Sequence, residues 1–413
     1  MSALLESLAK RLDDSFDDIE ARRTALDAVL RGGLPKPRSE KWKYTSLRAL
    51  ERRAFAAPAP AGADSALIAG IPAPRFVFVN GWFDADLSDF GDVPHLSRGS
   101  VTRAGLRVAD ATPDDVFDAL NGVLAMQGAS LHVPAGIAVD VPVHLVHIGA
   151  PTEGDEAWHM RHSIELADGA SLSVVEHHLA DGPHANLETA STQIVLGAGA
   201  QLTHVSIQAT ADGATRIART EATLADDARY RRLDLELGGA LSRHEFGCRL
   251  AGANAAVQAD GVLLGTGRRH IDTRLNIDHA VGDTRCDLTW RGRAADRSRV
   301  VLHGGIGIRA GADGSNATLS SRNLLLSENA EIDAQPVLEI FADEVQAAHG
   351  AAVGGLDPTA LFYLRSRGLP EADARRLLTA AFCRDVLGGL DDTLRPFAET
   401  ALDRALAALD PAA

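Results

Sequence analysis

Cysteine and histidine are the side chains of this 413-residue sequence with the most chemistry to offer. Three cysteines occur, Cys248, Cys286 and Cys383, and no CxxC or CxxH spacing places a second ligand near any of them along the chain. This spacing argues against a disulfide framework and against a zinc ribbon within the chain. If the chain handles iron or sulfur, its ligands must come singly or be shared with another subunit.

The surroundings of each cysteine favour a packing role. Cys248 and Cys286 lie in segments predicted to be strands, and Cys383 lies on the apolar face of a predicted helix. A buried cysteine behaves as a small hydrophobic side chain. Cys286 is the best candidate for sulfur chemistry, because the neighbouring Arg285 favours a thiolate. Two features oppose this: adjacent strand residues point to opposite faces, and Asp287 is acidic.

Histidines are spread along the middle of the chain. Ten lie where strands are predicted: His144, His147, His162, His177, His178, His204, His244, His270, His279 and His303. Their pattern favours ordinary solvated or hydrogen-bonded side chains. His349 stands apart, because it precedes Gly350 within the small, nonpolar run from Val345 to Leu356. Pattern alone favours a histidine that happens to lie on a loop over a functional imidazole.

Composition and charge exclude several classes of function. The 56 acidic residues outnumber the 41 basic ones, and the net charge of −15 argues against nucleic acid as a partner. The sequence contains no GxxxxGK[ST], GxSxG or HExxH motif. No apolar run approaches the roughly 20 residues that cross a bilayer, and the N-terminal segment is too acidic for a targeting peptide. We therefore expect a cytoplasmic protein without enzyme activity.

The elements that must position these side chains repeat along the chain. Short alternating strands joined by small residues align on two sets of positions: Leu166, Leu196 and Leu224, and Ala170, Ala200 and Ala228. A weaker fourth copy places Leu250 and Gly252-Ala253-Asn254 at the same points. A unit of this size cannot bury its own apolar face, so successive units are expected to stack. The sequence therefore predicts a mainly β fold, a right-handed parallel β-helix.

Three regions are expected. Residues 1–127 form a helical and mixed region with a linker at 56–74, residues 128–356 form the β-helix core, and residues 357–413 form a helical domain. In the last part of the core, the apolar runs Leu324–Leu326 and Val337–Phe341 are predicted to be buried strands. The final domain contains three amphipathic helices, which begin near Pro358, Pro370 and Asp391.

Five short pieces in this part of the chain carry a family resemblance. They are RNLLLS from Arg322, PVLEI from Pro336, ADEV from Ala342, HGA from His349 and LFYLRSRG from Leu361. Their order and spacing resemble the C-terminal signature of the SufB/SufD family, the scaffold subunits of the Suf iron–sulfur cluster assembly complex. HGA stands where SufB-type members carry a Cys followed by an acidic-His-acidic motif, so the chain resembles the SufD-type branch.

The resemblance implies a fold and a set of partners. Members have a β-helix core with helical ends, which agrees with the fold predicted from the repeats. A SufD-type chain would pair with SufB as a heterodimer, dock the SufC ATPase, and take part in iron acquisition and cluster formation. It would meet iron or an iron–sulfur cluster transiently in the complex, with no cofactor of its own in isolation. Whether the isolated chain is a monomer or a homodimer, and whether it binds a flavin, stay open.

The resemblance also implies roles for particular residues. His349 is the candidate ligand for iron or a nascent cluster at the SufB interface, and neutral imidazole is a competent iron ligand. Many SufD-type members carry a Cys two residues earlier, where this chain has Ala347. The candidate SufC-docking residues lie in the C-terminal helices: Phe362, Tyr363, Arg365, Arg367 and Phe382. The alternative for these helices is that they only seal the end of the β-helix.

Two other functions compete with this interpretation. One is a SufB-like subunit that accepts sulfur directly on cysteine, which the missing Cys at the HGA element disfavours. The other is a carbohydrate-active β-helix enzyme, which needs convergent carboxylates in a groove and usually a secretion signal. Co-purification with a SufC-like ATPase distinguishes the Suf functions from the enzyme.

Overall fold

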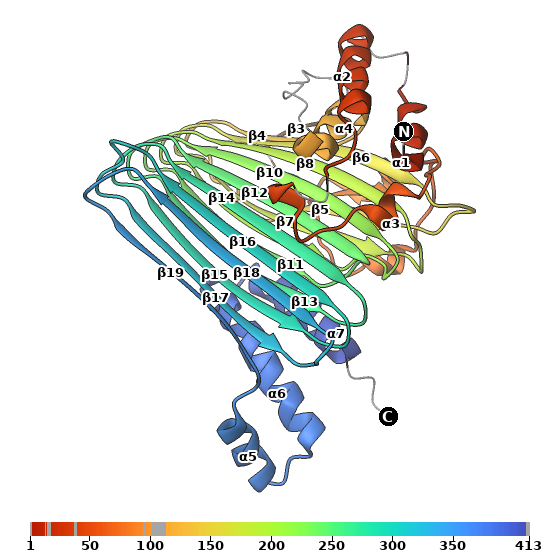
Figure 1. Cartoon of the computed structure of the whole chain (residues 1–413). Helices are drawn as coiled ribbons and strands as arrows, with labels where there is room; N and C mark the ends of the chain where they lie inside the picture. The colour runs from red at the N-terminus through yellow and green to blue at the C-terminus, as the bar shows by residue number, and fades with distance from the viewer. Residues whose placement is uncertain are drawn as a thin grey trace.

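Two long sheets, wound together from one continuous coil, form the body of the protein (Figure 1). This computed structural model describes residues 2–12, 14, 18–36, 39–93, 96–100 and 113–409, with only the backbone of 97–100. After the first four strands, successive strands alternate between the sheets, and almost all neighbouring strands within a sheet are parallel. The predicted parallel β-helix with helices at both ends of the chain is confirmed.

The ten-stranded sheet contains β1, β2 and every odd-numbered strand from β5 to β19. Their bounds are β1 (Arg75–Val79), β2 (Trp82–Asp89), β5 (Val143–Gly149), β7 (Ser171–Ala180), β9 (Gln201–Gln208), β11 (Arg229–Glu236), β13 (Ala256–Gly265), β15 (Arg285–Ala294), β17 (Asn316–Leu325) and β19 (Gln346–Gly354). β1 and β2 form the antiparallel hairpin that the Asn80-Gly81 turn signal indicates.

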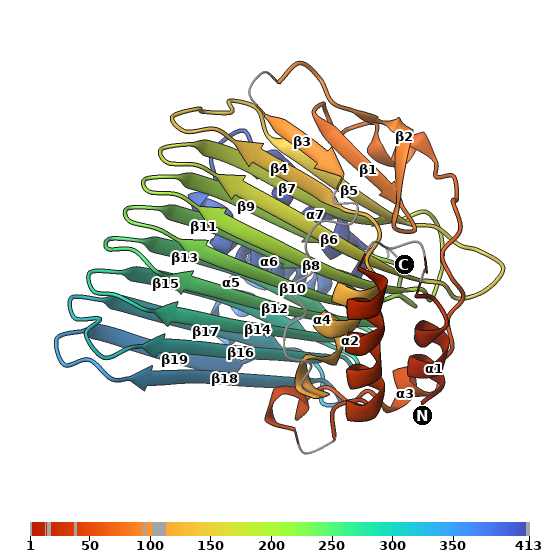
Figure 2. The same ribbon diagram turned by 90° about the horizontal axis from the view of Figure 1, so that it is seen from above.

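The nine-stranded sheet contains β3 and every even-numbered strand from β4 to β18. Their bounds are β3 (Ser97–Ser100), β4 (Ala129–Val133), β6 (Ala157–Leu166), β8 (Leu187–Leu196), β10 (Thr215–Leu224), β12 (Leu241–Leu250), β14 (His270–His279), β16 (Arg299–Ile308) and β18 (Glu331–Ile340). Figure 2 shows the strands of both sheets running side by side along the whole coil.

The repeat found in the sequence is the repeat of the coil. Leu166, Leu196, Leu224 and Leu250 occupy paired positions on β6, β8, β10 and β12, and each is at most 1% exposed. The column is buried because inward-facing positions recur at every second residue of each strand. Equivalent leucines of successive coils therefore pack on one another and form one continuous apolar core, which a single unit could not form alone.

The corner after each of these strands needs a left-handed backbone. Gly169, Gly199, Asp227 and Asn254 occupy equivalent corner positions with φ between 57° and 67°. Glycine adopts this region freely, and Asp and Asn tolerate it better than other residues. The next residue in each copy is a fully buried alanine. The small-residue corners predicted from the sequence therefore have a conformational cause as well as a packing one.

The N-terminal helices cover the outer face of the nine-stranded sheet. They are α1 (Ala3–Ala9), α2 (Ile19–Gly32), α3 (Arg48–Glu51) and α4 (Val116–Leu124), with short 3₁₀ turns at Glu40–Trp42, Ser65–Ile68 and Pro113–Asp115. Their apolar side chains share one buried cluster with Ala157, Leu187 and Ile217. Trp42 belongs to this cluster and donates through Nε1 to the Asp114 carbonyl, so it anchors the N-terminal segment on the body.

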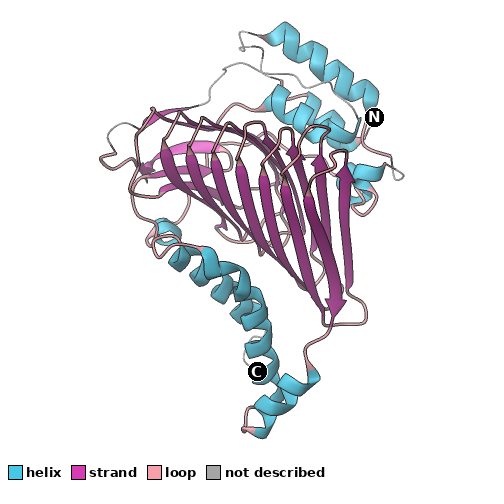
Figure 3. Ribbon diagram, turned by 90° about the vertical axis from the view of Figure 1, so that its left-hand side faces the viewer, coloured by secondary structure: helices cyan, strands magenta, loops and turns pink. Residues whose placement is uncertain are grey.

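The C-terminal helices lie on the opposite flank. The tail consists of α5 (Pro358–Ser366), α6 (Glu371–Arg384), the 3₁₀ turn Asp385–Gly389 and α7 (Arg395–Leu409) (Figure 3). Cys383, Leu394 and Leu402 are fully buried with the outward-facing side chains of the ten-stranded sheet. The alternative in which these helices seal the end of the β-helix is therefore wrong for α6 and α7, because they cover its side.

The last coil differs from the expected buried strands. β18 pairs only with β16 and β19 only with β17 among the described residues, so each sheet ends there with an uncovered edge. Ile340 is 43% exposed and Phe341 is 70% exposed. The prediction that Val337–Phe341 is buried was wrong, because an apolar run indicates burial only when another layer follows it.

Replacement of a leucine in the internal column should destabilise the protein strongly. Leu196→Ala removes a side chain that is 1% exposed, and such changes cost about 2–5 kcal/mol. Val195→Ala, at the adjacent position that is 45% exposed, should cost less than about 0.5 kcal/mol. Urea unfolding midpoints of the two variants measure the difference. Equal shifts would contradict the inward assignment of the leucine column.

Stability should fall as the pH drops below 6.5. Burial and the nearby Arg11 lower the pKa of His159 to about 3, so this imidazole stays neutral in the folded protein. The unfolded chain takes up a proton there below pH 6.5, which favours unfolding by up to about 1.4 kcal/mol per pH unit. Burial also lowers the pKa of other histidines, including His279 to about 4.

Urea unfolding at pH 5, 6 and 7 tests this linkage. The free energy of unfolding should decrease from pH 7 to pH 5. In His159→Asn, the new side chain can still accept a hydrogen bond from the Thr189 hydroxyl. The slope of the unfolding free energy against pH should be smaller in this variant by up to about 1.4 kcal/mol per pH unit, because one proton fewer is taken up on unfolding. An unchanged slope in this variant would show that His159 is not held neutral by the fold.

Candidate functional site

His349, the candidate iron ligand, lies on the last strand of the β-helix. It is paired in register with Leu319 on β17, which is itself paired with the buried Leu288 on β15. Ala347, two residues earlier, packs against the internal core. His349 therefore continues an inward-facing row, but its side chain is exposed because no described strand follows β19. An imidazole in this position is accessible from the open end of the coil.

The edge around His349 is long and carries several exposed apolar side chains, together with the acidic Glu331, Asp333 and Glu339 of β18. Val353 on β19 and Leu325 on β17 are 48% and 37% exposed, and Ile340 and Phe341 continue the apolar surface at the end of β18. β18 and β19 each present a row of backbone groups on the side that no described strand covers. Such edges are ready to pair with another chain unless charges or covering elements protect them.

α5 carries most of the predicted docking residues. It buries none of its side chains, and Phe362 and Tyr363 are 72% and 54% exposed. Arg367 donates to the Tyr363 hydroxyl at 2.7 Å and lies over its ring, while Arg365 pairs with Glu371 at 3.4 Å. The helix therefore presents two aromatic side chains next to two cations on a segment that projects from the body (Figure 3).

Phe382 is not part of this exposed group. It lies on α6, partly buried against the cluster that joins the tail to the ten-stranded sheet. The guanidinium of Arg291 lies 5.7 Å from the centre of its ring, and the same Arg291 pairs with Asp385 at 2.5 Å. The structure thus brings Phe362, Tyr363, Arg365 and Arg367 together and places Phe382 where it fastens α6 to the body.

All three cysteines are free and buried. Burial raises the pKa of Cys286 and of Cys383 to about 12, and raises that of Cys248 well above its usual value. Arg285, the predicted activator of Cys286, lies on the exposed side of the strand. None of the three is therefore prepared to act as a thiolate, and the packing role favoured by their sequence context is supported.

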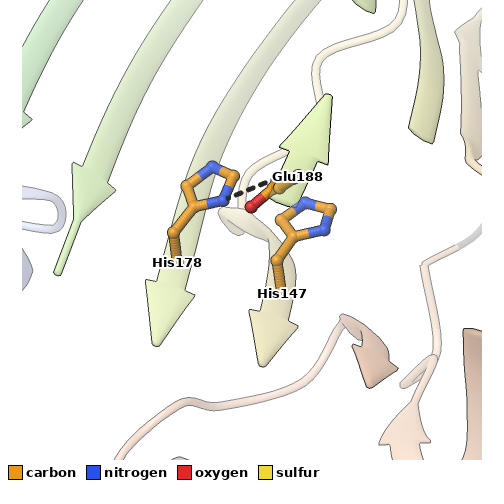
Figure 4. A group of neighbouring side chains, drawn as sticks. All are labelled: His147, His178 and Glu188. Atoms are coloured by element: carbon orange, nitrogen blue, oxygen red, sulfur yellow. Dashed lines mark ion pairs between the residues drawn. The ribbon is translucent and has the colours of Figure 1, made fainter. Parts of the chain in front are cut away.

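A buried polar cluster is the feature that sequence reasoning missed. His147 on β5, His178 on β7 and Glu188 on β8 point into the coil and toward one another (Figure 4). Each is at most 5% exposed. His147 and His178 are paired in register on adjacent strands, and their rings are stacked with centroids 4.6 Å apart. The 31-residue separation of these histidines matches the coil repeat, and that signal was available in the sequence.

Charge partners control the protonation of this cluster. Burial opposes a charge on His178, yet Glu188 and Glu176 lie close enough to raise its pKa. The same histidine holds the pKa of Glu188 well below its usual value, despite the cost of burial. For His147, burial and the neighbouring His178 and His162 outweigh the two glutamates and hold its pKa well below the usual value. The cluster therefore combines an ionised carboxylate, a neutral imidazole and an imidazole that readily holds a proton.

No helix among the described residues has the length and apolar character needed to span a membrane.

Comparison with known proteins agrees with the fold and with the C-terminal features. Residues 148–382 match the family described as "SUF system FeS cluster assembly, SufBD core domain". The "Iron-sulfur cluster assembly protein SufD" of Escherichia coli is 32% identical over 378 residues, covering 89% of this chain and 88% of that protein. These matches include most of the coil and the start of the helical tail.

Two further relatives carry related names. An "Iron-sulfur cluster assembly SufBD family protein" of Synechocystis is 28% identical over 394 residues, covering 89% of this chain and 86% of the relative. The SufD protein of Bacillus subtilis is 29% identical over 281 residues, covering 66% and 62%. With more than half of its length matched by the family core domain, this chain belongs to the SufB/SufD family of iron–sulfur cluster assembly proteins and is SufD-like.

Proposed function

We propose that this chain is a non-enzymatic scaffold subunit that pairs with a SufB-type subunit and binds a SufC-type ATPase in the cytoplasm. The observation that carries the proposal is the uncovered last coil, where β18 and β19 end the two sheets and His349 is exposed. Three cysteines without a disulfide partner fit a reducing compartment. Relatives named as assembly proteins, and not as enzymes, supply the context.

The proposed SufB-type partner continues the coil at this edge. A second β-helix that ends in the same way would satisfy the free backbone groups of β18 and β19 and cover the exposed Ile340, Phe341 and Val353. A heterodimer formed by joining two such ends removes both edges at once. His349 would then lie at the junction, where ligands from the two subunits meet.

His349 is proposed to bind iron or a nascent cluster at this junction. A single imidazole is an incomplete ligand set, and the three cysteines of this chain are buried, which raises the pKa of each thiol. The remaining ligands would therefore come from the partner. The same observation argues against the SufB-like alternative, because a sulfur acceptor needs an accessible thiolate.

α5 is proposed as the docking element for the SufC-type ATPase. Aromatic side chains that are exposed on a projecting helix and flanked by arginines have the composition of binding hot spots. ATP hydrolysis would take place on the ATPase, and its motion would shift the two scaffold subunits and open the junction at His349 to iron. α6 and α7 would transmit this motion, because they pack on the ten-stranded sheet.

Replacement of His349 should impair cluster formation without breaking the complex. In a complex reconstituted with SufB-type and SufC-type partners, His349→Ala is expected to lower the rate of cluster formation roughly tenfold or more, because an iron ligand is lost. Ultraviolet and visible absorption follows the cluster, and gel filtration follows the complex. His132→Ala, an exposed imidazole on β4, is the matched control. Unchanged cluster formation in His349→Ala would remove the ligand assignment.

Replacement of the aromatic pair on α5 should weaken binding of the ATPase. The double change Phe362→Ala with Tyr363→Ala should lower the affinity by about 2–4 kcal/mol, as expected for hot spots. Because α5 buries no side chain, the unfolding midpoint should not change. Calorimetric titration with the SufC-type ATPase measures the affinity, and Val195→Ala on the coil surface is the control.

Point changes are a sharper test than removal of the tail. Deletion after Asp357 would also remove α6 and α7 and expose the apolar flank of the ten-stranded sheet, so loss of binding would have two explanations. Full ATPase binding by the double variant would exclude α5 as the docking element.

A further inference from the structure

The cluster of His147, His178 and Glu188 has the composition of a metal site. One ligand atom of each residue lies within 4.8 Å of the other two. The three side chains come from adjacent strands of both sheets and converge inside the coil (Figure 4). This cluster is separate from His349, which lies on the last coil, whereas β5, β7 and β8 form the first coils.

Unused ligand atoms point to a missing partner. Nε2 of His147, Nδ1 of His178 and Oε1 of Glu188 are buried and make no hydrogen bond within the described part of the chain. His178 Nδ1 and Glu188 Oε1 lie 3.4 Å apart as an ion pair, but not in hydrogen-bond geometry. His178 Nδ1 and Glu188 Oε1 are thus held only by charge, and Nε2 of His147 has neither a hydrogen bond nor an ion pair among the described residues. Buried polar atoms are nearly always paired, so this arrangement requires an explanation.

The surroundings of His178 match those of metal-binding histidines. Its second nitrogen, Nε2, lies 3.4 Å from Oε2 of Glu176, which is also buried. Histidines that bind a metal usually donate their other N–H to a carboxylate, which fixes the ring and makes it a better ligand. Glu176 can accept the hydrogen bond from Nε2 of His178 when Nδ1 of the same ring binds the ion.

A small cavity connects the cluster with the loops at the corner of the coil. His147 and Glu188 line it together with His184 and Asn186. His184 is only partly buried, and its Nε2 also makes no hydrogen bond among the described residues. The cavity therefore lies beside two of the three proposed ligands, His147 and Glu188.

We propose that His147, His178 and Glu188 bind one divalent first-row transition metal ion inside the β-helix. Two imidazoles and one carboxylate suit ions such as Fe²⁺, Co²⁺ and Zn²⁺, and leave positions open for water. Mg²⁺ and Ca²⁺ prefer oxygen ligands and are not expected to bind. This proposal departs from the expectation that the isolated chain binds no cofactor, and it does not depend on the role proposed for His349.

Metal binding requires three local changes. The stacked rings of His147 and His178 must turn about χ2, a torsion with broad minima, so that their nitrogens converge on the ion. His178 must release the proton that it otherwise holds between the two carboxylates. Arg216, whose Nη2 lies 3.1 Å from His178 Nε2, must give up that contact, and its Nε already lies 3.6 Å from Glu188.

The charges around the cluster leave room for a cation. Four buried carboxyl groups face two buried guanidinium groups in this part of the interior: Glu176, Glu188, Asp234 and Glu236, with Arg216 and Arg232. The remaining positive charge comes from protons on the histidines that face these carboxyl groups, His178 and His204, or from a bound ion. The rival to the proposal is therefore a proton that links His178 to both glutamates, with no metal.

Cobalt titration of the full-length chain distinguishes the metal from the proton. After treatment with a chelator, the chain should bind one Co²⁺, with visible absorption bands typical of imidazole and carboxylate ligands. His147→Gln and Glu188→Gln should each weaken binding roughly a hundredfold or more, since a direct ligand contributes more than an outer partner. His159→Gln, a buried histidine outside the cluster, and His349→Ala should bind Co²⁺ like the unchanged chain.

X-ray absorption at the cobalt edge of the unchanged chain provides a test that does not require a variant to fold. It should show two imidazole ligands on the bound ion. No stoichiometric Co²⁺ binding by the unchanged chain, equal binding by Glu188→Gln, or fewer than two imidazoles would overturn the proposal in favour of the proton. Loss of Co²⁺ in His349→Ala alone would place the metal at the end of the coil instead.

Discussion

Hydrogen bonding between successive coils is the constraint on which this structure depends. Each strand from β5 to β17 pairs on both sides within its sheet, so its backbone groups are satisfied by the coil before it and the coil after it. Nothing in this pairing limits the number of coils, because each strand can pair with one more strand. The coil ends at β18 and β19 because the sequence turns into helices, and the last two strands keep one free side each. The exposure of His349 and the apolar edge around it both follow from this ending.

The sequence predicted the coil well because its signals are local and repeat. Leucine at the same place in each copy and a small residue at each corner fix the register of the stack, and both were visible without coordinates. The placement of the tail was not predictable in the same way. The apolar faces of α6 and α7 indicate that they pack, but a flat flank and an open end are equally suitable partners for an amphipathic helix.

The candidate site was predicted only in part, for a similar reason. The family resemblance singled out His349, and its position beside a small-residue run was compatible with a loop until the strand pairing with β17 was known. The buried cluster was missed because alternation was considered one strand at a time. Which side of a strand faces inward becomes clear only when His147, His178 and Gln208 are aligned through the repeat. Glu188 belongs to the other sheet, and no periodicity connects it to the histidines.

The attachment of the tail gives the chain a mechanical property. α5 is free of the body, whereas α6 and α7 are fixed along the flank of the ten-stranded sheet and reinforced by the ion pair of Arg291 with Asp385. The turn between α5 and α6 contains Gly368 and Pro370, and Arg365 bridges it to Glu371. A force applied to α5 would therefore pass to α6 and α7, and from them to the ten-stranded sheet on which they pack. The hydrogen-bonded strands of this sheet would then transmit the force to the free edge at β19.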